Sequence, residues 1–189
     1  MILLTGFEPF GGLSRNPSGD LALALDGRDV SGVVLPVDYA RIGPALAGLL
    51  PGDWDAVVLM GVAVGRPRIS LERVAINHRD PERTDNAGVV PEQSELVAGG
   101  REAYFSTLPL ETLRDDLAGA GLPVEISLTA GAYLCNASFY LARHLTRERE
   151  IPCGFVHLPP TPDLACAAEP LAFEEQQRAV TRILDVLRR

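Results

Sequence analysis

Residues 126–140 read ISLTAGAYLCNASFY, and within them a strand pattern changes to a helical pattern at a turn of small residues. The run that leads in, residues 124–128, alternates apolar and polar side chains, which predicts a strand. From Leu134 onward apolar residues recur at helical spacing, so Cys135 is expected in the first turn of a helix. The stretch therefore predicts a strand, a tight turn and a helix that begins with a cysteine.

Cys135 is the candidate nucleophile of this chain. The first N–H groups of a helix lack partners within the helix and carry the positive end of its dipole, so they stabilise a thiolate placed there. The same groups could receive an oxyanion that develops on an attacked carbonyl. The alternative is a small thiol that only fills space under a helix, because free cysteine is among the most buried residue types.

Strand and helix patterns alternate along the rest of the chain. Asn16 offers a capping side chain, with Pro17 at the first position of a short helix. The alternation predicts an α/β fold with a largely parallel, buried sheet. The expected strands are residues 1–5, 30–37, 55–62, 102–107 and 153–158, and the further expected helices are residues 43–50, 110–117 and 171–187.

Two segments depart from this alternation. Residues 65–77, GRPRISLERVAIN, resemble a strand but carry Glu72 and Arg73 among apolar neighbours. Either this pair forms the solvated face of an edge strand, or Glu72 accepts a hydrogen bond from a histidine and orients it. Residues 78–100 show no periodicity and are rich in proline, glycine, asparagine and acids, which predicts a long binding loop, lid or disordered segment.

Composition limits the possible classes of protein. The length of 189 residues and the 47% hydrophobic and 22% charged content predict one soluble globular domain, residues 1–189. A net charge of -8 makes nucleic acid and anionic membranes unexpected partners. Three cysteines without a CxxC pair predict reduced thiols and no structural zinc, and the start of the chain has no basic, apolar leader, so we expect a cytoplasmic protein. All 17 basic residues are arginine, which excludes lysine-based chemistry.

Only one of the three histidines is well placed to serve Cys135. His78 falls in the polar loop, and His144 lies about two and a half helical turns beyond Cys135. His157 ends an expected strand, and strand ends meet helix N-termini at the sites of open α/β sheets. We therefore expect His157 to act as the base for the cysteine.

Several motifs then occur in a characteristic order. They are GFEPFGG with NPS, GRPRISLERVAIN followed by DNAG, AYFSTLP, TAGAYLCN and GFVHLP. Over nearly the whole chain this set resembles the pyroglutamyl peptidase I (pyrrolidone-carboxylate peptidase) family of cysteine peptidases. The resemblance implies a single-domain α/β/α sandwich with a twisted, mixed sheet, no metal or cofactor, and a homotetramer that acts on small peptides with a blocked N-terminus.

The resemblance also assigns the site residues. It implies that Glu72, Cys135 and His157 are catalytic, as acid, nucleophile and base. It implies that an apolar pocket binds the pyroglutamyl ring, with positions matching Phe7, Phe10, Asn16, Tyr133 and Leu134. Before the resemblance is considered, Phe7 and Phe10 could equally be core residues that cap the first strand.

The chain departs from the family pattern in a few places. The arginine of the loop before DNAG, here Arg83, is shifted by one position, Val62 replaces a polar residue, and Leu128 replaces an asparagine. The chain is also shorter than expected for the family, with loops trimmed around Ser31 and Ala98. None of these changes falls on Glu72, Cys135 or His157.

Two other functions stay open at this point. One is a nucleoside- or phosphate-handling enzyme, although Gly6, Gly11 and Gly12 do not have the spacing of a nucleotide-binding loop. The other is a catalytically silent protein that binds pyroglutamyl peptides.

Overall fold

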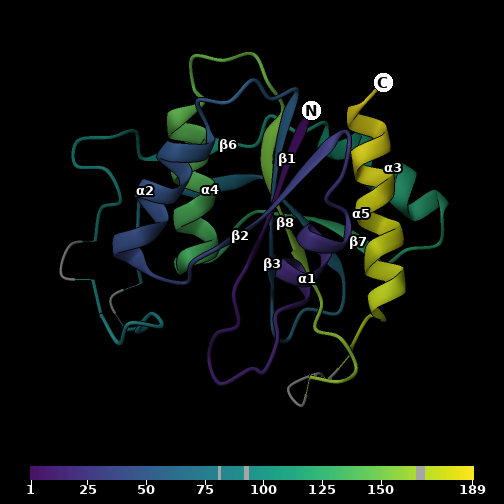
Figure 1. Cartoon of the computed structure of the whole chain (residues 1–189), viewed down its shortest axis with the longest axis horizontal. Coiled ribbons are helices and arrows are strands. Elements are labelled where there is room, and N and C mark those ends of the chain that lie inside the picture. Colours follow the sequence, from purple (N-terminus) through teal and green to yellow (C-terminus); the bar gives the residue numbers. More distant parts are fainter. Residues whose placement is uncertain (81, 92–93, 165–168) are drawn as a thin grey trace.

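The main sheet of the protein contains six strands, seen edge-on near the centre of the computed structural model (Figure 1). The structure describes residues 1–80, 82–91, 94–164 and 169–189. Within them the strand order is β2-β1-β3-β8-β4-β7, and every neighbouring pair is parallel except β4 and β8. The strands are β1 (Ile2–Phe7), β2 (Val30–Leu35), β3 (Ala56–Val62), β4 (Ile69–Glu72), β7 (Val124–Ser127) and β8 (Cys153–Leu158).

Helices cover both faces of this sheet (Figure 1). On one face lie α1 (Pro17–Ala24), α3 (Leu110–Gly119) and α5 (Phe173–Leu187), and on the other lie α2 (Tyr39–Leu49) and α4 (Leu134–Leu145). Each face has its own cluster of buried apolar side chains, and each fully buried Leu or Val contributes roughly 1.5–3 kcal/mol through the hydrophobic effect. The α/β/α sandwich with a mixed, largely parallel sheet is confirmed.

The alternation of side chains along two strands directs the polar residues of the sheet to one face. Val156 and Leu158 of β8 belong to the cluster beneath α1, α3 and α5, whereas Phe155 belongs to the cluster beneath α2 and α4. His157 therefore points to the α4 side, because successive side chains of a strand point to opposite faces. Glu72 of β4 stands opposite Phe155 in the register and shares that side.

Helix α1 packs so closely on the sheet that its backbone contacts the backbone of β1 and β2. This close contact fixes the loop that precedes the helix. A Cβ at Gly6 would lie 2.0 Å from the backbone oxygen of Ser18, and one at Gly32 would lie 1.9 Å from that of Ala22. Only glycine fits at these two points of contact.

The strand expected over residues 65–77 is split in the structure. β4 ends at Glu72, and after Arg73 the chain forms β5 (Val74–Ile76), which pairs with β6 (Ala103–Phe105) in a separate two-stranded sheet. Arg73 makes the transition, because its N–H donates to Ser127 while its carbonyl accepts from Ser106. The solvated edge-strand interpretation is wrong for Glu72, which is fully buried, since β4 lies between β8 and β7.

The second helix was expected from residue 43 to residue 50 but begins at Tyr39. The Asp38 side chain caps it by accepting from the N–H groups of Ala40, at 2.8 Å, and Arg41, at 3.0 Å. Pro44 consequently lies inside α2 rather than in its first turn. The other elements differ from the expected bounds only at their ends, as with α5, which begins at Phe173 instead of residue 171.

No helix in the described part of the chain is long and apolar enough to cross a bilayer.

The Asp38 cap yields a stability prediction. Asp38→Ala removes both side-chain acceptors from the start of α2, so we expect a loss of about 1 kcal/mol in the free energy of unfolding. Urea unfolding would measure the loss, with Asp53→Ala as the control, because Asp53 is exposed and caps no helix. Equal stability of the two variants would contradict the prediction.

Candidate active site

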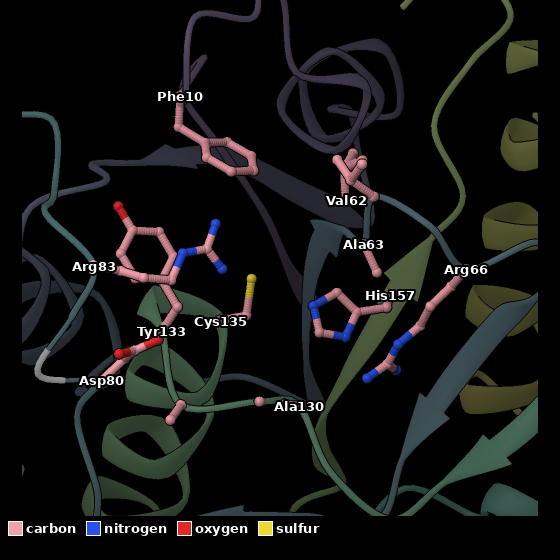
Figure 2. A pocket seen from close by; sticks show the side chains of 13 residues that line it. Phe10, Val62, Ala63, Arg66, Asp80, Arg83, Ala130, Tyr133, Cys135 and His157 are labelled. Carbon is pink, nitrogen blue, oxygen red and sulfur yellow. The ribbon is translucent and has the colours of Figure 1, made fainter. Parts of the chain in front are cut away.

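A cavity of about 370 Å³ opens where α4 begins and β8 ends (Figure 2). The Cys135 sulfur points into it, between the Tyr133 and Arg83 side chains on one side and the His157 ring on the other (Figure 2). Two of the three residues predicted to be catalytic therefore line a single cavity. The remaining walls come from the ends of strands and from loops and include Phe10, Val62, Ala63, Val64, Arg66, Asp80 and residues 130–132.

Cys135 lies in the first turn of α4, as the sequence predicts. Tyr133 is the N-cap residue, and no side chain of the described residues caps the helix, so no such cap occupies the N–H groups of the first turn. Gly61 of β3 makes room for the sulfur, because a Cβ at this position would lie 2.9 Å from Cys135 Sγ. The sulfur thus lies at the first N–H groups of α4, with the backbone of β3 close behind it.

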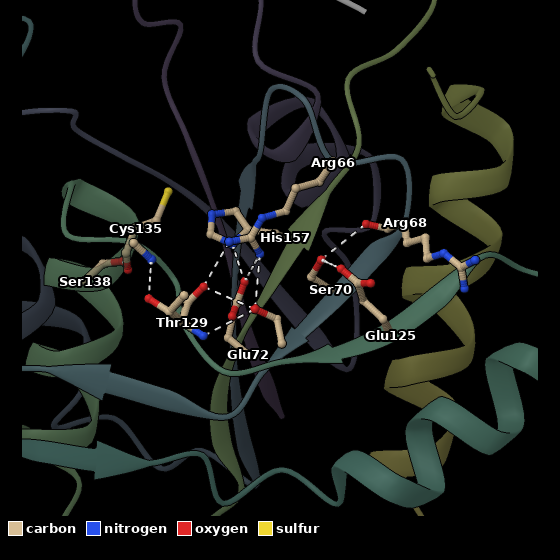
Figure 3. Close-up of polar contacts among 11 residues, drawn as sticks. Arg66, Arg68, Ser70, Glu72, Glu125, Thr129, Cys135, Ser138 and His157 are labelled. Carbon is tan, nitrogen blue, oxygen red and sulfur yellow. Dashed lines mark hydrogen bonds and ion pairs between the residues drawn. The ribbon is translucent and has the colours of Figure 1, made fainter. Parts of the chain in front are cut away.

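His157 and Glu72 form a buried hydrogen bond beneath the cavity (Figure 3). The distance from His157 Nδ1 to Glu72 Oε1 is 2.7 Å, and the two side chains are 5% and 0% exposed. This bond occupies Nδ1, so Nε2 is the ring nitrogen left for Cys135. The structure brings together all three residues that the resemblance assigns to catalysis.

The surroundings of His157 favour its charged form. Burial acts to lower its pKa, but the negative charge of Cys135 and the hydrogen bonds that the ring donates to Cys135 and Glu72 outweigh burial and raise the pKa to about 9. At neutral pH the imidazole is therefore protonated when Cys135 is a thiolate. Such an ion pair combines a nucleophile with a proton donor.

The other two cysteines differ from Cys135. Cys153 is fully buried in the core, and burial raises the pKa of its thiol to about 11, so it stays neutral and shielded from solvent. Cys166 falls outside the described residues.

A narrow apolar recess adjoins the Cys135 side of the cavity. Val37, Val62 and Cys135 form part of its walls. The other wall residues are the five expected to bind the substrate ring, Phe7, Phe10, Asn16, Tyr133 and Leu134. Phe7 and Leu134 are buried, so each belongs both to the core and to the wall of the recess, and their part in binding a substrate ring stays a prediction. Phe10 and Tyr133 are half-buried and face each other with ring centroids 6.4 Å apart.

Asn16 lines this recess, but its amide is already occupied. Its Oδ1 accepts from the N–H and hydroxyl of Ser18, at 3.1 and 2.8 Å, as the N-cap of α1. Its Nδ2 donates to the carbonyl of Glu8 at 3.0 Å. Asn16 therefore fixes the loop that carries Phe10, because its oxygen and one of its amide N–H groups are engaged there.

A second asparagine, Asn86 of the DNAG motif, holds the same loop from the opposite side. Its Nδ2 donates to Glu8 Oε1 at 3.2 Å and to the carbonyl of Pro9 at 2.9 Å, and its N–H donates to Val37 at 2.9 Å. The adjacent Asp85 is buried and accepts from the N–H groups of three residues. Residues 85–86 thus join two walls of the recess, Val37 and the Phe10 loop.

A third asparagine, Asn136, ties the nucleophile's helix to the chain next to it. Its side chain accepts from the N–H of Ile76 and donates to the carbonyls of Ile76 and His78, each at 2.9 Å. Nothing in the motifs alone marks Asn86, Asn136 or Gly61 as residues that build the site. Polar side chains in otherwise apolar or motif positions were the available signal for the two asparagines.

The loop that follows β5 contributes charged groups to the cavity. The Arg83 guanidinium stacks on the Tyr133 ring at 4.7 Å, and the Tyr133 hydroxyl donates to the carbonyl of Thr84 at 2.8 Å. Asp80 also lines the cavity. The shift of Arg83 by one position in the sequence therefore leaves this arginine at the site.

The remaining histidines lie elsewhere, as predicted. His144 bonds to the Tyr104 hydroxyl at 2.9 Å, and the His78 carbonyl accepts from Asn136. In the part of the chain that the structure describes, no group of three or more His, Cys, Asp or Glu side chains is placed to hold a metal ion.

Comparison with known proteins places the chain in a family. The family model described as pyroglutamyl peptidase matches residues 1–185. A pyrrolidone-carboxylate peptidase from Vibrio vulnificus is 42% identical over 88% of this chain and 82% of the relative, and one from Gloeobacter violaceus is 39% identical over 99% and 96%. A crystal structure of pyrrolidone carboxyl peptidase from Pyrococcus furiosus superposes with a TM-score of 0.93 at 35% identity, covering 98% of this chain and 97% of that one. The chain belongs to the pyroglutamyl peptidase family.

Proposed function

We propose that this chain is a cysteine exopeptidase that removes N-terminal pyroglutamate (5-oxoproline) from peptides through a thioester acyl-enzyme. The observation that carries the proposal is the position of Cys135, at the uncapped start of α4, between the His157–Glu72 pair and an apolar recess. Chemistry and ring binding thus meet at one sulfur atom. Membership of the pyroglutamyl peptidase family supports the same activity.

The first half of the reaction forms the thioester. The Cys135 thiolate attacks the carbonyl carbon of the pyroglutamyl residue, and the N–H groups of the first turn of α4 stabilise the oxyanion that develops. The imidazolium of His157 gives its proton to the departing amine as the C–N bond breaks. A shortened peptide with a free amino group leaves, and the pyroglutamyl group stays on the sulfur.

The second half returns the enzyme to its starting state. Neutral His157 takes a proton from a water molecule, and the hydroxide equivalent attacks the thioester carbon. The C–S bond breaks, so that pyroglutamate and the thiolate–imidazolium pair are regenerated. Glu72 holds Nδ1 throughout, which fixes the tautomer of His157 and stabilises its charged form. These proton transfers use side chains alone and call for no cofactor.

The apolar lining where the recess meets the cavity suits a flat, uncharged ring, because Phe10, Val62 and Tyr133 line both. Among the described residues its walls carry no carboxylate, and the amide of Asn16 is engaged by Ser18 and Glu8. A lactam has no free amine to neutralise and can be recognised by apolar contact and backbone hydrogen bonds. The recess therefore favours a blocked N-terminus over a charged one.

Release of an amine reporter from a pyroglutamyl amide, measured with and without a thiol alkylator, tests this function. Alkylator-sensitive release supports the peptidase, whereas binding without release would indicate the silent binding protein, and dependence on phosphate would indicate the nucleoside enzyme. A single peptidase domain, a homotetramer and a cytoplasmic location, all expected from the sequence, remain predictions alongside this proposal.

The nucleophile can be tested against the buried thiol. We expect Cys135→Ala to abolish reporter release and Cys153→Ala to retain it, because Cys153 is buried away from the cavity. Cys166→Ala, which lies outside the described residues, is also expected to stay active. Steady-state kinetics and mass spectrometry of the alkylated protein would measure both effects, and substantial activity in Cys135→Ala would refute the mechanism.

The role of Glu72 leads to a prediction for rate and pH dependence. Glu72→Gln should lower kcat by about a hundredfold or more yet leave some activity, while His157→Ala should be worse. Glu72 is one of the groups that raise the pKa of His157 to about 9, so its neutralisation lowers that pKa. The imidazolium that protonates the leaving amine then loses its proton at a lower pH, so the alkaline limb of the pH–activity profile should shift to lower pH. An unchanged rate and profile would show that Glu72 has no part in catalysis.

The recess predicts which N-termini are accepted. An α-ammonium buried there without a partner costs several kcal/mol, whereas Phe10→Ala removes roughly 1–3 kcal/mol of ring contact. We expect cleavage of pyroglutamyl amides and almost none of prolyl or glutaminyl amides near neutral pH, with Phe10→Ala weakening the first without creating the others. Comparable kcat/KM for prolyl and pyroglutamyl reporters would contradict this account of the recess.

A further inference from the structure

We propose that Arg66 is a positioning residue of this site, which holds the Glu72 carboxylate on His157 and links it to the turn that leads to Cys135. The inference rests on the proposed peptidase function and adds a residue that acts through Glu72. Arg66 lies in the loop between β3 and β4, and its side chain is 30% exposed, with its guanidinium directed inward (Figure 3).

The first observation is that one carboxylate oxygen receives two donors. Arg66 Nη1 lies 2.7 Å from Glu72 Oε1, and His157 Nδ1 lies 2.7 Å from the same atom. Glu72 Oε2 is buried and has no hydrogen-bond partner among the described residues. The orientation of the carboxylate therefore depends on Oε1, where Arg66 and His157 meet.

The second observation is that the guanidinium reaches the turn before the nucleophile. Arg66 Nη1 donates to Ser127 Oγ at 3.3 Å, and Nη2 donates to the carbonyl of Thr129 at 3.0 Å. Thr129 in turn accepts from the N–H of Gly131 through its hydroxyl, at 3.0 Å, and the chain continues into Tyr133 and Cys135. One planar group thus connects the acid and base on β4 and β8 with the segment that delivers the sulfur.

Charge is the third consideration. A fully buried carboxylate is expensive to keep ionised unless a cation and hydrogen bonds compensate it, and Arg66 supplies both. Among the described residues, the Arg66 guanidinium and the Cys135 thiol group face Glu72 and His157, and Asp80 and Arg83 line the far part of the cavity. Without Arg66, the buried Glu72 carboxylate loses one of its two cationic partners, so the arrangement that supports the thiolate–imidazolium pair is weakened.

A lysine at position 66 cannot reproduce the contacts of Arg66. The guanidinium presents donors in a fixed plane, so it bonds Glu72 and Thr129 through two different nitrogens, whereas an ammonium is a point charge on a flexible chain. Arg66→Lys therefore keeps the positive charge but loses the two donors in one plane, and Arg66→Gln loses both the charge and this pair of donors. Arg68 provides a matched control, because it is an exposed arginine two residues away and makes no ion pair among the described residues.

The experiment compares Arg66→Gln, Arg66→Lys and Arg68→Gln with the wild type, and each is also combined with Glu72→Gln. Two quantities are measured: kcat and KM on a pyroglutamyl amide reporter, and the rate of Cys135 alkylation by iodoacetamide as a function of pH. Thermal unfolding by circular dichroism identifies any variant that does not fold. The alkylation profile needs no substrate, so it still tests Arg66 if the wild type fails to cleave the reporter, which would refute only the proposed function.

We expect Arg66→Gln to lower kcat by about ten- to hundredfold with KM changed less than about threefold, because orientation is lost rather than substrate contact. The acid limb of its alkylation profile should move to higher pH by about half a unit to one unit. Arg66→Lys should keep the limb near its wild-type position and recover only part of kcat, and Arg68→Gln should match the wild type.

The double variants decide whether Arg66 acts through Glu72. If it does, adding Arg66→Gln to Glu72→Gln lowers kcat little further, because the carboxylate that Arg66 positions is already gone. Multiplicative losses in the double variant would overturn the proposal and make Arg66 a structural brace of residues 127–129. Wild-type kcat and alkylation in Arg66→Gln would overturn it as well, and should Arg66→Gln not fold, Arg66→Lys with and without Glu72→Gln gives the same decision.

Discussion

The site depends on one buried hydrogen bond, from His157 to Glu72 across the junction of β8 and β4. A carboxylate that is fully removed from water is costly, and its partners recover that cost only if they stay in place. The sheet provides this rigidity because β4 is an interior strand that pairs with β8 on one side and β7 on the other. The antiparallel β4–β8 pair, the only one in the described main sheet, is also the pair that brings the acid beside the base.

The two sides of the cavity divide the work of the proposed reaction. The His157 side is polar and closely bonded, with Glu72 and Arg66 behind the imidazole. The Cys135 side carries the apolar recess beside Arg83 and Asp80, and this recess is fixed from outside by Asn16 and Asn86, whose amides hold the Phe10 loop at Glu8 and Pro9. The amide groups of Asn16 and Asn86 are thereby engaged in building the walls of the recess. The first turn of α4 lies between the two sides, where a carbonyl must be placed for attack.

Much of the fold follows from local sequence pattern. Short apolar runs that alternate with amphipathic segments specify an α/β layer structure, and the observed strands β1, β3 and β8 agree with the expected ones to within a few residues. The two predictions that were wrong, the start of α2 and the single strand over residues 65–77, have local physical causes. The capping carboxylate of Asp38 starts α2 four residues before the predicted position, and the run over residues 65–77 is divided because the backbone of Arg73 bonds to two different segments. Neither the competition among caps nor the partner of a strand can be read from periodicity alone.

The sequence by itself determined that Cys135 begins a helix and that His157 ends a strand, because both are properties of a few neighbouring residues. With the motifs that carry the family resemblance, it also named Glu72 and the residues of the recess. Only the tertiary structure decided that Glu72 is buried, that Arg66 and His157 both donate to Glu72 Oε1, and that three asparagines frame the site. Several of these contacts join residues far apart in the chain, such as Glu72 and His157, which are 85 positions apart. They depend on strand register and on the packing of loops against the sheet, which local propensities do not encode.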